Sequence, residues 1–292
     1  MGIEVSIVAG ADRSTSSVQV SGSVQHVITE KEKVTFGVVD ASLKEAVAKY
    51  FGKKPNDVYL HSPTPWGDLY KTYGWSQVQT YLTAEKAEIT SITSEPTIIA
   101  KKTLVNNSSK QATFDASISD QVSNTVESYW SSTDSIEVSQ TVTYKVTLKE
   151  VFEVGGQTSF SYGHTWGKGG SESKTTTVGS TSGVTVTLDP GEAVEARLTA
   201  TRGVMKVRIT YKAYLIGQCA VNYNPTYKGH HFWALGIGNI MSAAGLQKER
   251  TFIEDIEVGY YTNDKVEIVD KKGELKQVVF LADQPGGEMQ SA

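Results

Sequence analysis

Apolar and polar residues alternate along the chain from residue 136 to residue 154. Most even positions are apolar, whereas the odd positions from 137 to 149 are hydroxylic or charged. Because neighbouring strand side chains point to opposite faces, this pattern predicts a β-ribbon with one oily face and one polar face. Soluble strands are usually about 3 to 10 residues long, so the ribbon is longer than a compact domain needs. It suits the wall of a barrel that has lipid outside and water inside.

A second alternating segment follows the first and predicts a hairpin. Val138–Leu148 and Thr158–Lys168 each contain eleven residues, and a β-strand needs about 9 to 11 residues to cross a bilayer. Residues 149–157 between them would form the tip. If the limbs pair so that position numbers sum to 306, Val146 faces Phe160 and both oily faces lie on the same side.

The predicted hairpin divides its side chains into two sets. The lipid-facing set consists of Val138, Val142, Tyr144, Val146, Leu148, Phe152, Phe160, Tyr162 and Trp166. The lumen-facing set consists of Ser139, Thr141, Thr143, Lys145, Thr147, Ser159, Ser161 and Thr165. Such a lumen would be wet and weakly cationic, which predicts a mild preference for anions. Backbone groups in lipid must all be paired, so several hairpins must close into a barrel. Before that, the oily face must be covered.

The alternative is a long hairpin in an ordinary β-sandwich, with serine and threonine on the solvent face. Gln140 and His164 fall on the oily face and weaken the insertion hypothesis. The joint length of the two limbs and the aromatic residues of the oily face favour insertion.

The chain before the hairpin predicts short strands and one clear helix. Strands are expected over residues 1–40, where Val34 and Phe36 alternate with polar neighbours. Apolar residues at helical spacing, followed by glycine, predict a helix over Asp40–Gly52. Much later, residues 237–246 are compatible with a short helix.

Serine and threonine make up about a third of residues 103–202. Valine, isoleucine and tyrosine interleave with them at period two, which predicts long strands with hydroxylic faces. A further hairpin is expected from Val194–Ala200 to Met205–Leu215, around a turn at Arg202-Gly203. Two separate strands are expected between residues 253 and 269.

Four aromatic residues lie close together among glycine and proline: Trp66, Tyr70, Tyr73 and Trp75. One interpretation is a small core under long loops. The other is a binding surface for a sugar or a lipid headgroup, because amphipathic rings stack on sugars and sit well at interfaces. Both interpretations stay open from the sequence, and the second makes these four residues candidates for receptor binding.

Composition excludes several classes of protein. The chain has 292 residues and a net charge of -4, so it has no basic field for nucleic acid. Its one cysteine, Cys219, cannot form an intramolecular disulfide and is expected to be a buried structural thiol. The N-terminus lacks the basic start and apolar core of a signal peptide. We therefore expect the protein to be made soluble, without a cleavable signal peptide.

No catalytic constellation is recognisable. None of the five histidines lies in a recognisable nucleophile–base context, and no Gly-x-Ser-x-Gly motif occurs. His230 and His231 are adjacent and would point apart on a strand, without an acidic or cysteine partner at ligand spacing. Residues 167–170 lack the full pattern of a phosphate-binding loop. We expect no enzymatic activity, no cofactor and no metal.

The sequence resembles the aerolysin-type β-pore-forming family, also called the epsilon-toxin and mosquitocidal-toxin-like group, over residues 96–217. The most specific part is the Ser-Phe-Ser-Tyr-x-x-Thr-Trp-Gly run of Ser159–Gly167, followed by the turn at Asp189-Pro190-Gly191. More weakly, Trp66–Trp75 resembles the spherulin and yolk-protein-like branch. The resemblance implies an elongated β-rich monomer, binding to an unidentified cell-surface receptor, a homo-oligomeric ring on the target membrane, and a barrel of one hairpin per subunit.

These arguments predict a mainly β protein of aerolysin-like architecture, with long twisted antiparallel strands and a small α-containing head. The predicted organisation is a receptor-binding head with one helix (1–95), a pore-forming β module (96–217) with the insertion hairpin at about 136–168, and a C-terminal segment (218–292) that packs on the head or the sheet and ends in a mobile tail (285–292). The predicted function is that of a pore-forming cytolytic toxin acting outside the producing cell. The rival is a non-lytic carbohydrate-binding or storage protein with the same fold.

Overall fold

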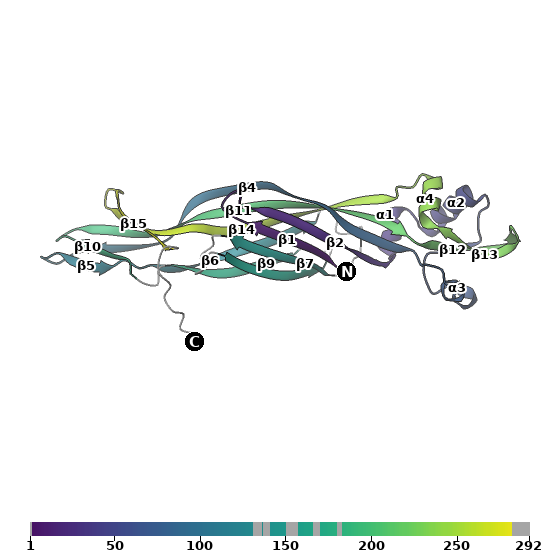
Figure 1. The fold of residues 1–292 in the computed structure, drawn as a ribbon, viewed down its shortest axis with the longest axis horizontal. Helices are drawn as coiled ribbons and strands as arrows, with labels where there is room; N and C mark the ends of the chain where they lie inside the picture. Colours follow the sequence, from purple (N-terminus) through teal and green to yellow (C-terminus); the bar gives the residue numbers. More distant parts are fainter. Residues whose placement is uncertain are drawn as a thin grey trace.

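The protein, described as a computed structural model, is a long narrow molecule built mainly from antiparallel strands (Figure 1). The structure describes residues 2–130, 136, 141–149, 157–165, 170–179 and 183–281. Helices gather at one end and form a small head, and long strands lead from this head along the molecule. The prediction of a mainly β chain with long antiparallel strands and a small helix-containing head is therefore confirmed.

The elements of the described chain follow one another in this order along the sequence. The strands are β1 (Ile3–Ala9), β2 (Ser17–Val27), β3 (Asp57–Tyr59), β4 (Gln79–Val105), β5 (Ala112–Asp115), β6 (Ser119–Trp130), β7 (Thr141–Lys149), β8 (Gln157–Thr165), β9 (Gly170–Gly179), β10 (Thr185–Leu188), β11 (Ala193–Ile216), β12 (Gln218–Tyr227), β13 (His230–Gly236), β14 (Glu249–Asp270) and β15 (Leu275–Phe280). The helices are α1 (Glu30–Phe36), α2 (Asp40–Phe51), α3 (Pro65–Tyr73) and α4 (Ile237–Ala244).

One large sheet carries the molecule. Its strand order is β8-β7-β1-β2-β4-β11-β14-β6-β9, with β15 paired to β14. Within this sheet β1 and β7 run parallel, and the other described pairs run antiparallel. Two smaller sheets complete the fold: β13-β12-β3 in the head, and β10-β5 at the opposite tip (Figure 1).

The central strand β11 is unbroken, so the predicted turn at Arg202-Gly203 is wrong. Its residues pair with β4 on one side and with β14 on the other over nearly its whole length. Gly203 serves packing instead of a turn, because a Cβ atom there would lie only 2.5 Å from the ring of Tyr260. The strands expected separately between residues 253 and 269 are likewise one strand, β14.

The helix of α2 is confirmed, whereas the strand expected around Val34 and Phe36 is wrong. A capping box explains the difference: the Thr29 side chain accepts from the Glu32 N–H, and the Glu32 carboxylate accepts from the Thr29 N–H. Gly37 then ends α1 in the left-handed region, with φ of 70°. The short helix expected near residue 240 is confirmed as α4, and α3 was not expected.

The buried side chains form two main clusters along the molecule. The larger joins the head to the middle of the long sheet, and the smaller lies toward the tip that carries β5 and β10. Cys219 is fully buried in the larger cluster, and burial raises the pKa of its thiol. The prediction of a buried structural thiol is confirmed.

The long sheet continues across the first of the predicted lobe boundaries. The boundary after residue 95 falls inside β4, and β1 and β2, which precede it, belong to the long sheet. The boundary after residue 217 falls between β11 and β12, and β12 and β13 lie in the head (Figure 1). The expected tail at 285–292 lies outside the described residues.

Candidate functional site

The β7–β8 hairpin has the register expected from the sequence. Val146 pairs with Phe160, Tyr144 with Tyr162 and Val142 with His164. The position numbers of every described pair therefore sum to 306, which confirms the predicted register. A one-residue slip would turn the apolar set of one limb to the opposite face, so the matched alternation supports this register.

The oily face of β7 is completely covered. The side chains of Val142, Tyr144, Val146 and Leu148 have 0% of their surface exposed and belong to the larger core cluster. They pack in this cluster with inward side chains of β1, β11 and β14. The expectation that the folded protein hides this face is confirmed for the β7 limb.

The polar face of the hairpin is turned to solvent. Thr143, Lys145, Ser159 and Ser161 are exposed. Thr147 is an exception among the predicted lumen residues, because it is 7% exposed and hydrogen-bonded to Ser159 at 3.0 Å between the two hydroxyl oxygens.

The remaining predicted hairpin residues are described less fully. Thr141, Phe160, Tyr162 and Thr165 lie within the strands of the hairpin. Four others lie outside the described residues: Val138, Ser139, Phe152 and Trp166. The membrane-facing and lumen-facing assignments stay predictions.

The hairpin lies at an end of the sheet. β8 is the terminal strand in the strand order, and β7 is joined to the remaining sheet by β1. That junction is a parallel ladder from Glu4 opposite Thr143 to Ala9 opposite Leu148. Within the described sheet, separating the hairpin would break this one ladder and leave the other strands paired.

A buried carboxyl group holds β7 against the opposite part of the sheet. Glu254 of β14 is 0% exposed and accepts hydrogen bonds from three hydroxyl groups. Ser128 Oγ of β6 donates to its Oε1 at 2.5 Å, Tyr211 Oη of β11 donates to its Oε2 at 2.6 Å, and Tyr144 Oη of β7 donates to Oε1. Because β7 and β14 are far apart in the strand order, the sheet must curl over the core for this contact to form.

Burial raises the pKa of the Glu254 carboxyl to about 7, from an ordinary value of 4.5. The three hydroxyl donors act in the opposite direction, because they stabilise the charged form, and nearby Asp255 adds a small further rise. The sequence offered a signal for this group: Glu254 stands between Phe252 and Ile256 on the apolar face of an alternating strand.

An aromatic surface lies on the head and consists of Trp66, Tyr73, Trp75 and Phe232. Trp66 and Tyr73 are 48% and 52% exposed. The rings of Tyr73 and Trp75 are stacked, with centroids 4.8 Å apart and planes 18° apart, and Trp66 lies 5.1 Å from Phe232. Phe232 comes from β13 and was not among the expected residues.

The backbone under Trp66 adopts a conformation that is uncommon for residues with side chains. Trp66, Gly67 and Asp68 have φ values of 63°, 77° and 62°. The Thr64 hydroxyl fastens this kink by accepting from the Leu69 N–H at 2.8 Å. Such backbone conformations occur where surrounding contacts enforce them, and they gather at binding sites.

Tyr70 does not belong to the aromatic surface, because it is 3% exposed. Its hydroxyl contacts the Tyr59 and Gln218 carbonyl oxygens at 2.8 and 2.9 Å and accepts from the Ala220 N–H at 3.2 Å. The expectation that Tyr70 contacts a receptor is corrected: it joins α3 to β3 and β12 beneath the surface.

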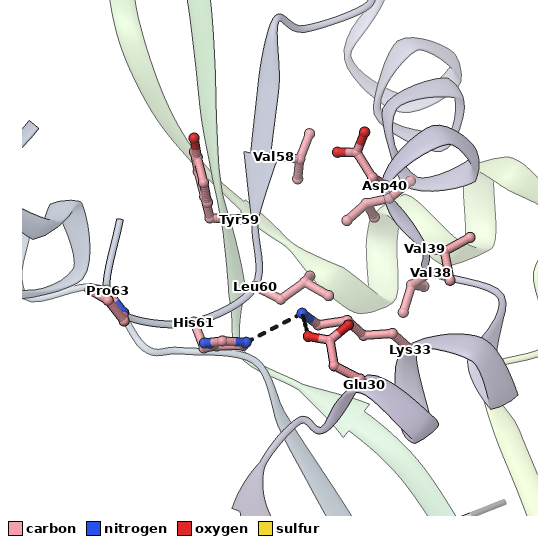
Figure 2. Close-up of a pocket in the computed structure, with 11 residues that line it drawn as sticks. Glu30, Lys33, Val38, Val39, Asp40, Val58, Tyr59, Leu60, His61 and Pro63 are labelled. Atoms are coloured by element: carbon pink, nitrogen blue, oxygen red, sulfur yellow. Dashed lines mark hydrogen bonds and ion pairs between the residues drawn. The ribbon is translucent and has the colours of Figure 1, made fainter. Parts of the chain in front are cut away.

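A pocket of about 270 Å³ lies beside this region, between α1, α2 and the segment around β3 (Figure 2). The Lys33 ammonium points between Glu30 Oε1, at 2.5 Å, and His61 Nε2, at 3.3 Å. The hydrogen bond from Lys33 lowers the pKa of Glu30. The Lys33 ammonium is therefore already paired within the protein. Its contacts link α1 to the chain near His61.

Among the described residues, no cluster of three or more histidine, cysteine, aspartate or glutamate side chains could hold a metal ion. The helices of the described chain include none that is long and apolar enough to span a membrane.

Comparison with known proteins identifies relatives of this chain. No family model matches the chain. U-megalopygitoxin(8)-Mc8 of Megalopyge crispata is 37% identical over 257 residues, which cover 88% of each chain. U-megalopygitoxin(8)-Mo12 of Megalopyge opercularis is 36% identical over 259 residues, again covering 88% of each chain.

The fold is similar to that of parasporin-2, a Bacillus thuringiensis toxin that recognizes cancer cells. The TM-score is 0.66 at 18% identity, and the match covers 89% of this chain and 100% of that one. The predicted elongated aerolysin-like architecture is confirmed, whereas the narrower resemblances to the epsilon-toxin group and to spherulin stay predictions. The chain belongs to the U-megalopygitoxin(8) family of toxins and has an aerolysin-like fold.

Proposed function

We propose that this protein is a pore-forming toxin that binds a target membrane, oligomerises, and inserts the β7–β8 hairpin of each subunit into a shared β-barrel. The observation that carries the proposal is the hairpin itself. The oily face of its β7 limb is fully buried, the described side chains of its polar face other than Thr147 are exposed, and within the described sheet one ladder, to β1, attaches it to the other strands.

The energetics of insertion are consistent with this arrangement. Each large apolar side chain kept from water contributes about 1.5 to 3 kcal/mol, so exposing the β7 face to water would be strongly unfavourable. Transfer to lipid keeps these side chains away from water. Pairing between hairpins of neighbouring subunits would satisfy the backbone groups at the free edges, which lipid cannot do.

The aromatic surface of the head supports a role in target binding. Trp66 and Tyr73 are large and exposed, and the backbone is kinked at Trp66. Rings of this kind stack on sugars and sit at membrane interfaces. We assign receptor binding to this surface, and the receptor would be a glycan, a lipid or a protein. In this proposal the toxin acts outside the producing cell and catalyses no reaction.

A disulfide lock on the hairpin tests insertion. Ser6 of β1 pairs with Lys145 of β7, and neighbouring strands lie about 4.7 to 4.9 Å apart, within the Cα separation that a disulfide accepts. A Ser6→Cys/Lys145→Cys variant can therefore staple β7 to β1. The matched control is Ser6→Cys/Gln19→Cys, which staples β1 to β2 and leaves the hairpin free. Cys219 is fully buried and does not compete.

The readouts are haemoglobin release from erythrocytes and dye release from phosphatidylcholine–cholesterol vesicles. The oxidised hairpin lock should release neither, and reduction should restore release. The control should be active in both redox states. Release by the oxidised lock at the rate of the reduced form would contradict insertion of β7.

The stacked Tyr73 and Trp75 rings also favour a second function, that of a non-lytic carbohydrate-binding protein. Glycan-array binding by a protein that releases no dye in either redox state would support this alternative.

A further inference from the structure

Glu254 is an acidic residue at a fully buried position of the core. It is 0% exposed, and its hydrogen-bond donors are neutral hydroxyls from three different strands. Asp255, the next residue, pairs with Arg208 at 2.8 Å and adds negative charge nearby. The titratable groups that face Glu254 among the described residues are Tyr144 and Tyr211.

The three donors differ in what insertion would do to them. Ser128 and Tyr211 lie on β6 and β11, which flank β14 in the sheet and would stay with it. Tyr144 lies on β7 and would leave with the hairpin. The contact between Tyr144 and Glu254 therefore bridges the part of the molecule that would move and the part that would not.

We infer that Glu254 is a proton-controlled latch on the insertion hairpin: the Tyr144 hydroxyl ties β7 to the buried carboxyl, and ionisation of this carboxyl favours release, because a charge gains more from water than the three hydroxyls supply. The inference rests on the proposed function and adds its regulation. Departure of β7 uncovers the inward side of β14 and lets water reach the carboxyl.

The direction of the effect follows from proton binding. Burial raises the pKa of the latched carboxyl to about 7, whereas a carboxyl in water returns to about 4.3. The latched form therefore binds the proton more tightly than the released form. By linkage, low pH favours the latched form, and a rise of pH through neutrality favours release.

Hydrogen exchange in solution, with no membrane present, tests the latch independently of pore formation. Tyr144→Phe removes only the hydroxyl and should lower the protection factors of β7 amides at least about tenfold, the equivalent of about 1.4 kcal/mol. Ser128→Ala is the matched control, because it removes a donor to the same carboxyl from β6, a strand that stays in place. It should change β7 protection by less than about threefold.

Glu254→Gln tests the role of the proton. In the unsubstituted protein, β7 protection should fall about tenfold or more between about pH 5.5 and pH 8.5, and Gln, which cannot ionise, should abolish most of this fall. Equal loss of β7 protection in Tyr144→Phe and Ser128→Ala, or the same pH dependence in Glu254→Gln, would overturn the latch. If these results hold while no membrane is ever permeabilised, the proposed function fails and the latch remains.

Discussion

Replacing Glu254 by glutamine should change how the stability of the whole fold depends on pH. The carboxyl has a pKa of about 7 in the folded protein, compared with an ordinary value of 4.5. Because the folded state binds this proton more tightly, Glu254 contributes its full stabilisation below about pH 4.5 and loses it as the pH rises through about 7. Glutamine keeps the shape of the side chain and has no such titration.

The size of the effect follows from the pKa shift. A shift of about 2.5 units at about 1.36 kcal/mol per unit corresponds to about 3 kcal/mol. Glu254 is fully buried, so solvent screening does not reduce this figure substantially. Relative to Glu254→Gln, the unsubstituted protein should therefore lose about 3 kcal/mol of unfolding free energy between about pH 4.5 and pH 9.

Urea unfolding of both proteins at several pH values, followed by tryptophan fluorescence, measures this difference. Subtracting the variant removes the contribution of groups that titrate equally in both proteins. A difference that stays constant with pH would refute the argument that burial dominates the Glu254 environment. If the unsubstituted protein instead lost stability relative to the variant as the pH fell, the three hydroxyls would outweigh burial.

Three further predictions concern other parts of the molecule. Gly203→Ala should destabilise the fold by about 1 to 3 kcal/mol, because its Cβ would lie 2.5 Å from the Tyr260 ring; thermal unfolding measures this, and an unchanged midpoint would show that the ring yields easily. Lys145→Gln should reduce the anion preference of single channels in planar bilayers without changing the free energy of unfolding by more than about 0.5 kcal/mol; unaltered selectivity would remove Lys145 from the lumen. Trp66→Ala, with Tyr73→Ala as a second variant, should weaken binding to erythrocytes about tenfold or more, while circular dichroism stays unchanged; undiminished binding would place the receptor site elsewhere.

Local pattern predicted the hairpin well. The alternation around Val146 and Phe160 set the faces of the limbs, and a one-residue slip between the limbs would have separated the two apolar sets. The helix of α2 was also predictable, because its apolar spacing and the glycine that follows it are local signals.

The local sequence pattern gave wrong predictions where the same pattern is compatible with two kinds of local structure. Val34 and Phe36 alternate like strand residues, but the capping interaction of Thr29 with Glu32 starts a helix there. Arg202-Gly203 looked like a turn, because a glycine can serve either a turn or a close contact between strands. Only the position of Tyr260 shows which role this glycine has.

The sequence by itself determined the β-rich class, the two-faced hairpin and its register, because each depends on residues near one another in the chain. Tertiary structure decided that this hairpin lies at the end of the sheet, that Tyr70 is buried, and that Tyr144 meets Glu254 across 110 residues of chain. The physical reason is that the curl of the sheet brings β7 over β14. The sequence shows that Glu254 lies on an apolar face. Which hydroxyl group donates a hydrogen bond to its carboxyl depends on which distant strand packs against β14.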